Sequence, residues 1–245
     1  MSKTLTIPRV RSLMRTASTS RVLVIGDVML DQFLWGHVKR ISPEAPVPVV
    51  EFERESFMPG GAANVARNLT ALGTGVELFG LVGKDDGAKR LRALLKGDAV
   101  GSGGLKPVSD RMTTRKTRVV AHQQQVVRID RETKQAGDRR TTKWLLSAVE
   151  KELAGTGAVV VADYNKGVVT QELLEGLRAL CRPRGIWLSL DPKPSHQLDI
   201  SGLSLITPNR GELFELAGLT DETRHSNPLR DKNLIAAVKA VQAAY

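Results

Sequence analysis

The stretch Pro59-Gly60-Gly61-Ala62-Ala63-Asn64-Val65-Ala66 places two glycines directly before an amphipathic segment. It follows a strand-like run at 21–27 (Arg-Val-Leu-Val-Ile-Gly-Asp) and a second carboxylate at Asp31. Glycine lets the backbone approach a ligand closely, and the start of a helix offers free N–H groups and a positive dipole end. Asn64, in the first turn, can both donate and accept hydrogen bonds. The pattern fits a site for a polyhydroxylated ligand, and it fits a plain glycine turn before a helix equally well.

Strand-like and helix-like segments alternate on both sides of this stretch. Continuous apolar runs at 22–27 and 158–162 indicate strands that are buried on both faces. The other predicted strands are 76–82, 186–190 and 203–206, and the predicted helices are 61–72, 85–95, 144–153 and 171–181. Repeated strand–helix units predict an α/β fold with a mainly parallel sheet covered by helices.

Two segments, 33–57 and 115–130, interrupt this alternation. Both have apolar residues at every second position, and the first also contains Pro43, Pro46 and Pro48. We predict that both form antiparallel strands of a flap outside the main sheet. Since a single flap would leave the apolar residues of 33–57 exposed, we expect it to pair with the same element of a second chain in a symmetric homodimer.

Composition limits the classes of function. The 245 residues carry a net charge of +10, which indicates a generally basic surface or attraction of anionic ligands. A nucleic-acid partner rests on charge alone, and an aromatic content of 4% opposes base stacking. Cys181 is the single cysteine, which excludes an intramolecular disulfide and fits a cytoplasmic setting. No apolar run reaches transmembrane length, so we expect no membrane partner.

The N-terminal segment and the histidines have plainer interpretations. Residues 1–20 contain basic side chains and no acidic one, and we expect a floppy or loosely packed arm before the main domain at 21–245. The four histidines lack metal-ligand spacing, and each is predicted to be a surface or loop residue: His37, His122, His196 and His225.

Polar side chains gather where the predicted strands end. In an open parallel sheet, ligands bind outside the carboxyl ends of the strands. Lysines can neutralise phosphoryl oxygens, and a carboxylate can hold Mg²⁺ through water. The alternative is a set of turn residues and solvated charges. The residues in question are Asp27, Asp31, Asp163, Lys166, Asp191, Lys193, Asn209 and Glu212.

The second flap segment is rich in cations, namely Arg115, Lys116, Arg118 and Arg128. Alternation places Lys116 and Arg118 on one face, where arginine is suited to bidentate capture of a phosphate. The alternative is an exposed strand edge that positive charge protects from pairing.

Taken together, these motifs resemble the ribokinase-like (PfkB) sugar kinases over nearly the whole chain from about Arg21. The glycine pair resembles the family's first signature, and Gly-Asp-Val-Met-Leu-Asp at 26–31 its opening strand. The segment 40–49 (Arg-Ile-Ser-Pro-Glu-Ala-Pro-Val-Pro-Val) is more specific and is similar to the flap of the heptose 7-phosphate kinases. Further matches to that subgroup lie at 116–119, 124–130, 163–167, 191–193 and 207–212.

The resemblance implies a ribokinase-like three-layer sandwich with a small β-sheet lid that also forms a dimer interface. It implies that ATP, with Mg²⁺, phosphorylates the anomeric hydroxyl of D-glycero-β-D-manno-heptose 7-phosphate for lipopolysaccharide core synthesis. The implied contacts to sugar hydroxyls are Asp31, Gly60, Gly61 and Asn64, and those to the substrate phosphate are Lys116 and Arg118, with Asp163 and Lys166 also in the substrate site. Lys193 and Asn209 would face the ATP phosphates, and Glu212 the hydrated Mg²⁺.

One family signature is missing. Ribokinase-like kinases carry Gly-Ala-Gly-Asp, whose glycines form an anion hole and whose aspartate is the catalytic base, and the 245 residues contain no such motif. The resemblance therefore implies that the C-terminal part of the fold is absent, and it assigns no catalytic residue. Alternatives are another ribokinase-like sugar or nucleoside kinase, or a non-catalytic protein that binds sugar phosphates.

Overall fold

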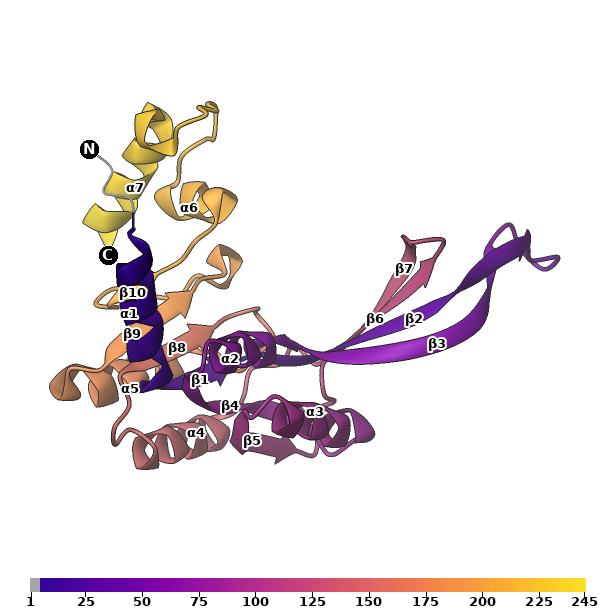
Figure 1. The fold of residues 1–245 in the computed structure, drawn as a ribbon, viewed down its shortest axis with the longest axis horizontal. Helices are drawn as coiled ribbons and strands as arrows, with labels where there is room; N and C mark the ends of the chain where they lie inside the picture. The colour runs from indigo at the N-terminus through magenta and orange to yellow at the C-terminus, as the bar shows by residue number, and fades with distance from the viewer. Residues whose placement is uncertain (1–4) are drawn as a thin grey trace.

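The structure is a computed structural model that describes residues 5–245, and its larger sheet has six parallel strands (Figure 1). Their order across the sheet is β10 (Leu205–Ile206), β9 (Trp187–Asp191), β8 (Ala158–Ala162), β1 (Arg21–Gly26), β4 (Gly75–Gly83) and β5 (Gly101–Val108). The prediction of a mainly parallel sheet is confirmed.

Helices cover both faces of this sheet. On one face, α4 (Arg139–Lys151) and α5 (Gln171–Cys181) pack on Leu23 and Ile25; on the other, α2 (Ala62–Ala71) and α3 (Asp86–Gly97) pack around Val24. Alternate residues of β1 thus enter different cores, which explains its continuous apolar run. A third, smaller core joins α6 (Arg210–Ala217) to α7 (Lys232–Ala244). The three-layer α/β arrangement is confirmed.

The predicted flap is a second sheet that projects from the body as a long lid (Figure 1). Its order is β3 (Pro48–Gly61), β2 (Val28–Ile41), β6 (Arg115–Ala121) and β7 (Gln124–Arg131). Each hairpin, β2–β3 and β6–β7, is antiparallel, but β2 and β6 pair in parallel, so the prediction of purely antiparallel strands was wrong at that junction. Alternation defines the faces of a strand and carries no information about the direction of its neighbour.

The lid strands also begin deeper in the molecule than 33–57 indicated. Val28, Met29 and Leu30 are buried, and only Asp27 separates the end of β1 from the start of β2. The lid is therefore continuous with the central strand of the sheet, and its first residues lie at the carboxyl edge where ligands bind in such folds.

The N-terminal segment contains the helix α1 (Ile7–Ser18), in which no residue is buried. The first four residues of the predicted arm lie outside the described part of the chain. Among residues 5–245, no helix has both the length and the apolar character needed to cross a bilayer.

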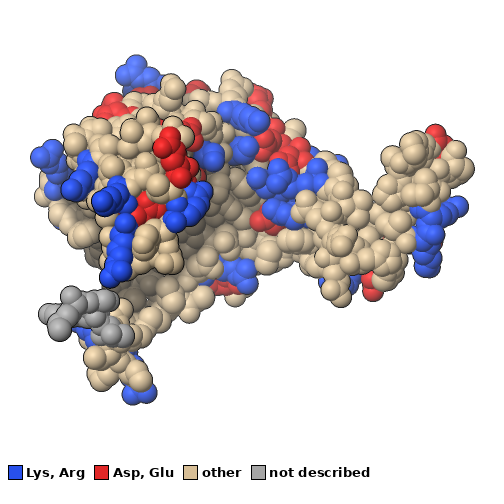
Figure 2. All heavy atoms as spheres, turned by 90° about the horizontal axis from the view of Figure 1, so that it is seen from above, with Lys and Arg blue, Asp and Glu red and all other residues tan. Residues whose placement is uncertain are grey.

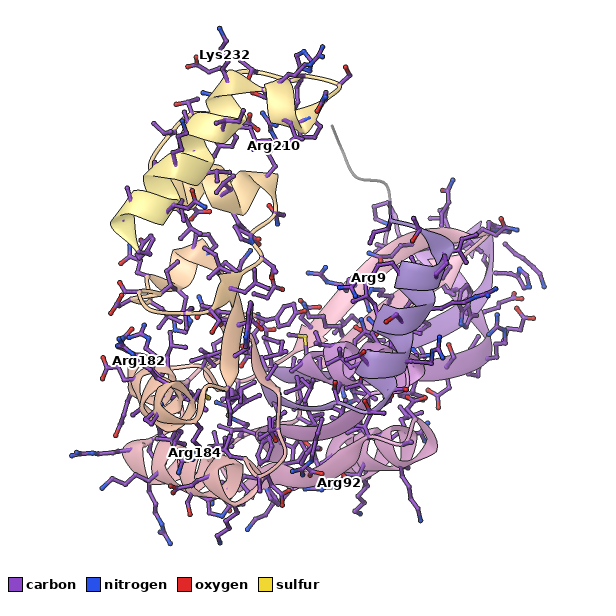
Figure 3. The ribbon with its side chains drawn as sticks, turned by 60° about the vertical axis from the view of Figure 1, so that its left-hand side comes forward. Arg9, Arg92, Arg182, Arg184, Arg210 and Lys232 are labelled. Carbon is purple, nitrogen blue, oxygen red and sulfur yellow. The ribbon has the colours of Figure 1, made fainter. Side chains whose placement is uncertain are left out.

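Basic side chains are spread over many elements. On the face in Figure 2, lysines and arginines lie on the body and on the lid with acidic side chains among them. In Figure 3, Arg9, Arg182 and Lys232 extend from three separate elements, and all three are exposed. The face in Figure 2 has no continuous stripe of lysines and arginines, the pattern that is typical of proteins that bind a nucleic-acid backbone.

Candidate active site

The candidate site lies where the root of the lid meets the carboxyl ends of β1, β8, β9 and β10. Asp27, the first residue after β1, is buried, and its carboxylate accepts hydrogen bonds from main-chain amides of the segment after β8. Asp27 is therefore not available to a ligand, although it belongs to the predicted row of strand-end carboxylates.

Asp31 on β2 forms an ion pair with Arg118 on β6, with Oδ1 and Nη1 2.6 Å apart. The guanidinium of Arg118 also lies over the ring of Phe33, 5.3 Å from its centroid. A Cβ at residue 60 would overlap Oδ2 of Asp31, so the first glycine of the pair leaves room for this carboxylate. The structure thus brings three predicted site residues together.

Lys116 is the direct neighbour of Asp31 across the β2–β6 pairing and of Asp130 across β6–β7. Side chains of laterally paired residues emerge on the same face of a sheet, and residues two apart share that face. Lys116, Arg118 and Asp31 therefore lie on one face of the lid, with two cations beside two carboxylates.

The second glycine and Asn64 mark the start of α2. Gly61 occupies the N-cap position with φ of +57°, and a Cβ there would overlap the main-chain oxygen of Asp27. Asn64 lies in the first turn of α2 with its side chain exposed, beside amide groups that have no partner within the helix.

Asp163, the residue after β8, is 3% exposed and bonds to two groups. Its Oδ1 accepts a hydrogen bond from the Asn165 amide (2.8 Å), and its Oδ2 lies 2.8 Å from Nδ1 of His196. Burial raises the pKa of the Asp163 carboxyl above its ordinary value, against the hydrogen bonds from Asn165 and His196. His196 lies in the short 3₁₀ turn Pro194–His196 between β9 and β10, in keeping with its prediction as a surface or loop histidine. The sequence did not indicate its contact with Asp163, because that partner is remote in the chain.

Lys166 points to Glu132, with Nζ 2.9 Å from Oε1, and both side chains are mostly buried. Burial acts to raise the pKa of Glu132, but the hydrogen bonds and charges of Lys166 and Lys134 together outweigh it, so this pKa lies below its ordinary value. Lys166 is thus held in an ion pair with Glu132, a partner that the sequence did not indicate.

Tyr164 lies at the point where the two halves of the site meet. Burial raises the pKa of its phenol, and so do the carboxylates of Asp191, Asp27, Asp31 and Glu212. Lid, central strands and α6 therefore contribute charges around one hydroxyl group. The sequence signal for Tyr164 was its position directly after a strand-end aspartate.

The predicted nucleotide side is built on the start of α6. The side chain of Asn209 accepts a hydrogen bond from the Glu212 amide (3.0 Å), and Oε2 of Glu212 accepts one from the Asn209 amide (2.9 Å). This capping box stabilises the helix start. The other oxygen of Glu212 lies 3.8 Å from Nζ of Lys193, beside a cavity of about 560 Å³ that Lys193, Asp163 and Glu215 help to line.

Within residues 5–245, no group of three or more His, Cys, Asp or Glu is arranged to hold a metal ion directly. Burial raises the pKa of Asp191, and the nearby charge of Glu212 adds to this rise. Two carboxylates whose charges act on each other, those of Asp191 and Glu212, suit a Mg²⁺ ion that keeps most of its water ligands.

Fold and site together define an α/β protein in which a β lid faces a row of polar strand ends. The sequence matches the pfkB family of carbohydrate kinases over residues 19–244. The chain belongs to this family.

Several curated relatives carry the same name. The protein called Bifunctional protein HldE from Caulobacter vibrioides is 40% identical over 230 residues, which are 94% of this chain and 47% of that protein. The protein of that name from Sulfurimonas denitrificans is 38% identical over 208 residues, 85% of this chain and 44% of that protein. The chain thus spans less than half the length of these relatives.

Solved structures share the fold. Arabidopsis thaliana ribokinase, complexed with ribose and ATP, matches with a TM-score of 0.64 and 16% identity over 92% of this chain and 69% of that one. The tetrameric inhibited form of phosphofructokinase-2 from Escherichia coli matches with a TM-score of 0.67 and 21% identity. The match covers 92% of this chain and 71% of that one. At these identities the likeness concerns architecture.

Proposed function

We propose that this chain is the sugar-binding and part of the ATP-binding framework of a heptose 7-phosphate kinase. The reaction transfers the γ-phosphoryl group of ATP to the anomeric hydroxyl of D-glycero-β-D-manno-heptose 7-phosphate and yields the 1,7-bisphosphate. The observation that carries the proposal is the cluster of Asp31, Lys116 and Arg118 on one face of the lid. It offers an acceptor for sugar hydroxyls beside cations for a phosphate. The relatives named HldE support the same assignment.

The proposed roles follow the positions of the residues. Asp31, with the backbone at Gly60 and Gly61 and the amide of Asn64, holds sugar hydroxyls, while Lys116 and Arg118 hold the 7-phosphate. Asp163 and Lys166 line the same substrate site. Lys193 and Asn209 face the ATP phosphates, and Glu212 holds Mg²⁺ through water. When bound, ATP and Mg²⁺ supply the phosphoryl group and neutralise its charge.

The proposal includes weak activity for residues 1–245 on their own. General-base catalysis contributes roughly 10²–10⁴-fold to rates, and the family's Gly-Ala-Gly-Asp signature does not occur in these residues. We expect little ATP-dependent phosphorylation from purified 1–245, and restored turnover when a segment with that signature is fused to it. Turnover by 1–245 equal to that of the fused protein would show that another residue acts as the base.

Calorimetry tests the substrate directly. We expect heptose 7-phosphate to bind more tightly than unphosphorylated heptose, and Arg118→Ala to remove about 1–3 kcal/mol of that preference. Arg90→Ala is a matched control, because Arg90 also lies over a phenylalanine, Phe57, and near a carboxylate, Glu55. It should leave the preference unchanged. Equal affinity of the wild-type protein for both sugars would reject the phosphate-binding role and favour another sugar or nucleoside kinase.

A further inference from the structure

The segment 163–168 wraps around the buried carboxylate of Asp27, which is 1% exposed. Oδ2 of Asp27 accepts hydrogen bonds from the amides of Tyr164 (2.9 Å) and Lys166 (3.0 Å), and Oδ1 accepts one from Val168 (3.0 Å). Every second amide of the segment thus points at one side chain. An ionised carboxylate accepts several amide bonds at once, and each is stronger than a bond between neutral groups.

The main chain of Asp27 ties the same point to two other elements. Its amide donates to the oxygen of Ala162 at the end of β8 (3.1 Å), and its oxygen accepts from the Ala62 amide at the start of α2 (2.9 Å). A shift of Asp27 therefore moves the glycine turn and the segment after β8 together.

Arg111 holds the opposite side of the segment and is itself buried. Its guanidinium donates to the main-chain oxygens of Lys166 (2.9 Å), Thr133 (3.2 Å) and Gln135. Burial lowers the pKa of Arg111, and the charge of Asp27 acts in the opposite direction. A buried carboxylate thus binds the amides of the segment and a buried guanidinium binds a carbonyl of it.

The backbone held between these two groups is left-handed at two positions. Asn165 has φ of +53° and Gly167 has φ of +87°. Glycine adopts this conformation freely, and asparagine adopts it more readily than most residues, so the sequence permits the turn that Asp27 and Arg111 hold. The segment carries Asp163, Tyr164 and Lys166, which all face the candidate site.

We propose that Asp27 and Arg111 are positioning residues for the sugar site. They fix the backbone of 163–168, and through it the side chains of Tyr164 and Lys166, without touching the substrate. The part of this inference that concerns sugar binding rests on the proposed function, whereas the part that concerns the backbone does not.

The test combines hydrogen exchange with calorimetry on Asp27→Asn and Arg111→Lys. The asparagine keeps the size of the side chain but replaces an acceptor oxygen by a donor, and the lysine keeps the charge but lacks the planar fork. We expect exchange at the amides of Tyr164, Lys166 and Val168 to accelerate by about tenfold or more. Amides of α5 should keep their wild-type rates, and heptose 7-phosphate should bind about tenfold more weakly.

Asp231→Asn is the matched control, because Asp231 is also a buried carboxylate that accepts an amide bond, at the start of α7. It should lower the melting temperature without changing either readout. Unchanged exchange at the three amides, or faster exchange with unchanged affinity, would overturn the proposal. Should the wild-type protein bind no heptose 7-phosphate, the proposed substrate fails, and the exchange rates alone decide whether Asp27 and Arg111 hold the segment. If Asp27→Asn does not fold, the exchange rates and the affinity of Arg111→Lys decide the test.

Discussion

Two adjacent glycines serve different physical purposes. Gly60 leaves room for the end of a side chain, the carboxylate of Asp31, while Gly61 adopts φ of +57° against the main-chain oxygen of Asp27. A side-chain end can move aside, but a main-chain oxygen within a buried network cannot move without the strand that carries it. A side chain at residue 60 would therefore displace a carboxylate of the site, whereas a side chain at residue 61 would disturb the main chain of the fold.

Substitution by alanine should separate these purposes. Gly60→Ala should destabilise the fold less than Gly61→Ala, because the end of a side chain has to move rather than the main chain, but it should weaken sugar-phosphate binding because it displaces Asp31. Gly61→Ala should cost roughly 3 kcal/mol or more, since strain and overlap add. Gly185→Ala is the control for strain alone, because Gly185 has φ of +64° and no atom lies within 4 Å of the place that an added methyl group would take. Urea unfolding and calorimetry measure both quantities; equal destabilisation at 60 and 61 would contradict the distinction.

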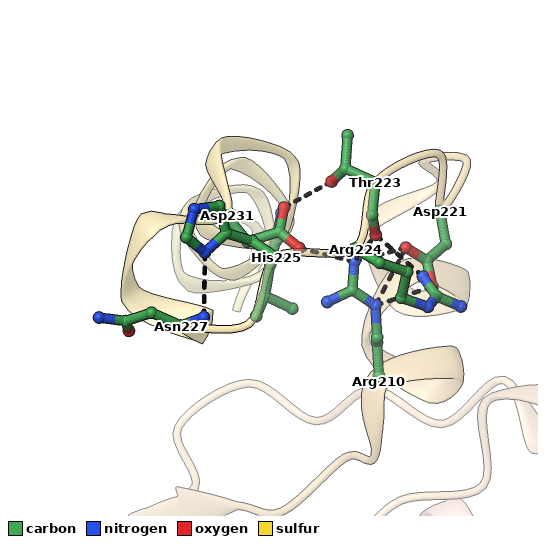
Figure 4. A network of polar contacts seen from close by, with 8 residues as sticks. Arg210, Asp221, Thr223, Arg224, His225, Asn227 and Asp231 are labelled. Carbon is green, nitrogen blue, oxygen red and sulfur yellow. Dashed lines mark hydrogen bonds and ion pairs between the residues drawn. The ribbon is translucent and has the colours of Figure 1, made fainter.

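At the scale of elements, polar contacts fasten α6 to α7 (Figure 4). Arg210 at the start of α6 bonds to both oxygens of Asp221 and to Asp231, 3.0 Å away, which caps α7. Thr223 donates to the other oxygen of Asp231 (2.5 Å). Since α6 also carries Asn209 and Glu212 at its start, this cluster helps to hold the predicted nucleotide side in place.

Acid should loosen this cluster through Asp231. The hydrogen bond from Thr223, with further bonds from the Leu234 amide and Arg210, lowers the pKa of Asp231 from 3.8 to about 2. A lowered folded-state pKa stabilises the fold above the unfolded value, and this contribution is lost as pH falls from 3.8 toward about 2. Urea unfolding at about pH 6 and about pH 2.5 should show a smaller pH-dependent loss in Asp231→Asn than in the wild type. Glu222→Gln, an exposed change nearby, should behave as wild type; an identical loss in Asp231→Asn would refute the linkage.

At the scale of the whole molecule, the lid has two unlike faces. Asp31, Lys116 and Arg118 lie on one face. The β2–β6 and β6–β7 pairings place Leu34, Val119 and Val127 in one row of the other face, with Ile129 two residues from Val127. Val127 and Ile129 are 47% and 48% exposed. The polar side chains of Gln32, Glu55 and Thr117 lie on the same face. We propose that the apolar residues of this face pair with a second copy of the chain, since exposed apolar residues of this kind commonly mark an interface.

Sedimentation tests the homodimer. The wild-type protein should sediment as a dimer at micromolar concentration, and Ile129→Asp should shift it to a monomer by placing a charge in the interface. Leu229→Asp is the control, because Leu229 is 82% exposed and lies in the 3₁₀ turn Pro228–Arg230, far from the lid in sequence and element. A wild-type monomer with a native circular-dichroism spectrum would contradict the proposal.

The spacing of apolar residues in the sequence was sufficient to predict the bounds of the most regular strand and helix. The apolar run of β8 and the helical period of α5 predict the observed bounds, 158–162 and 171–181, because the spacing of apolar residues follows the period of the strand or helix itself. The spacing of apolar residues did not predict β5, which contains three glycines and Pro107 and becomes a strand through pairing with β4. It also placed the start of α4 at 144, whereas Asp138 caps the helix so that it begins at Arg139.

In the candidate site, too, the sequence predicts one part and the tertiary structure decides the other. The residue types at strand ends, and their placement at one edge of the sheet, follow from the order of strands and helices in the sequence. The partners of those residues do not: Asp31 pairs with Arg118, Asp163 with His196, and Lys166 with Glu132. A periodic pattern specifies the face on which a side chain emerges, but the charge that meets it comes from a segment tens of residues away. Only the packing of the sheet and lid brings those segments within hydrogen-bond distance, and that packing decides which polar groups remain free for a ligand.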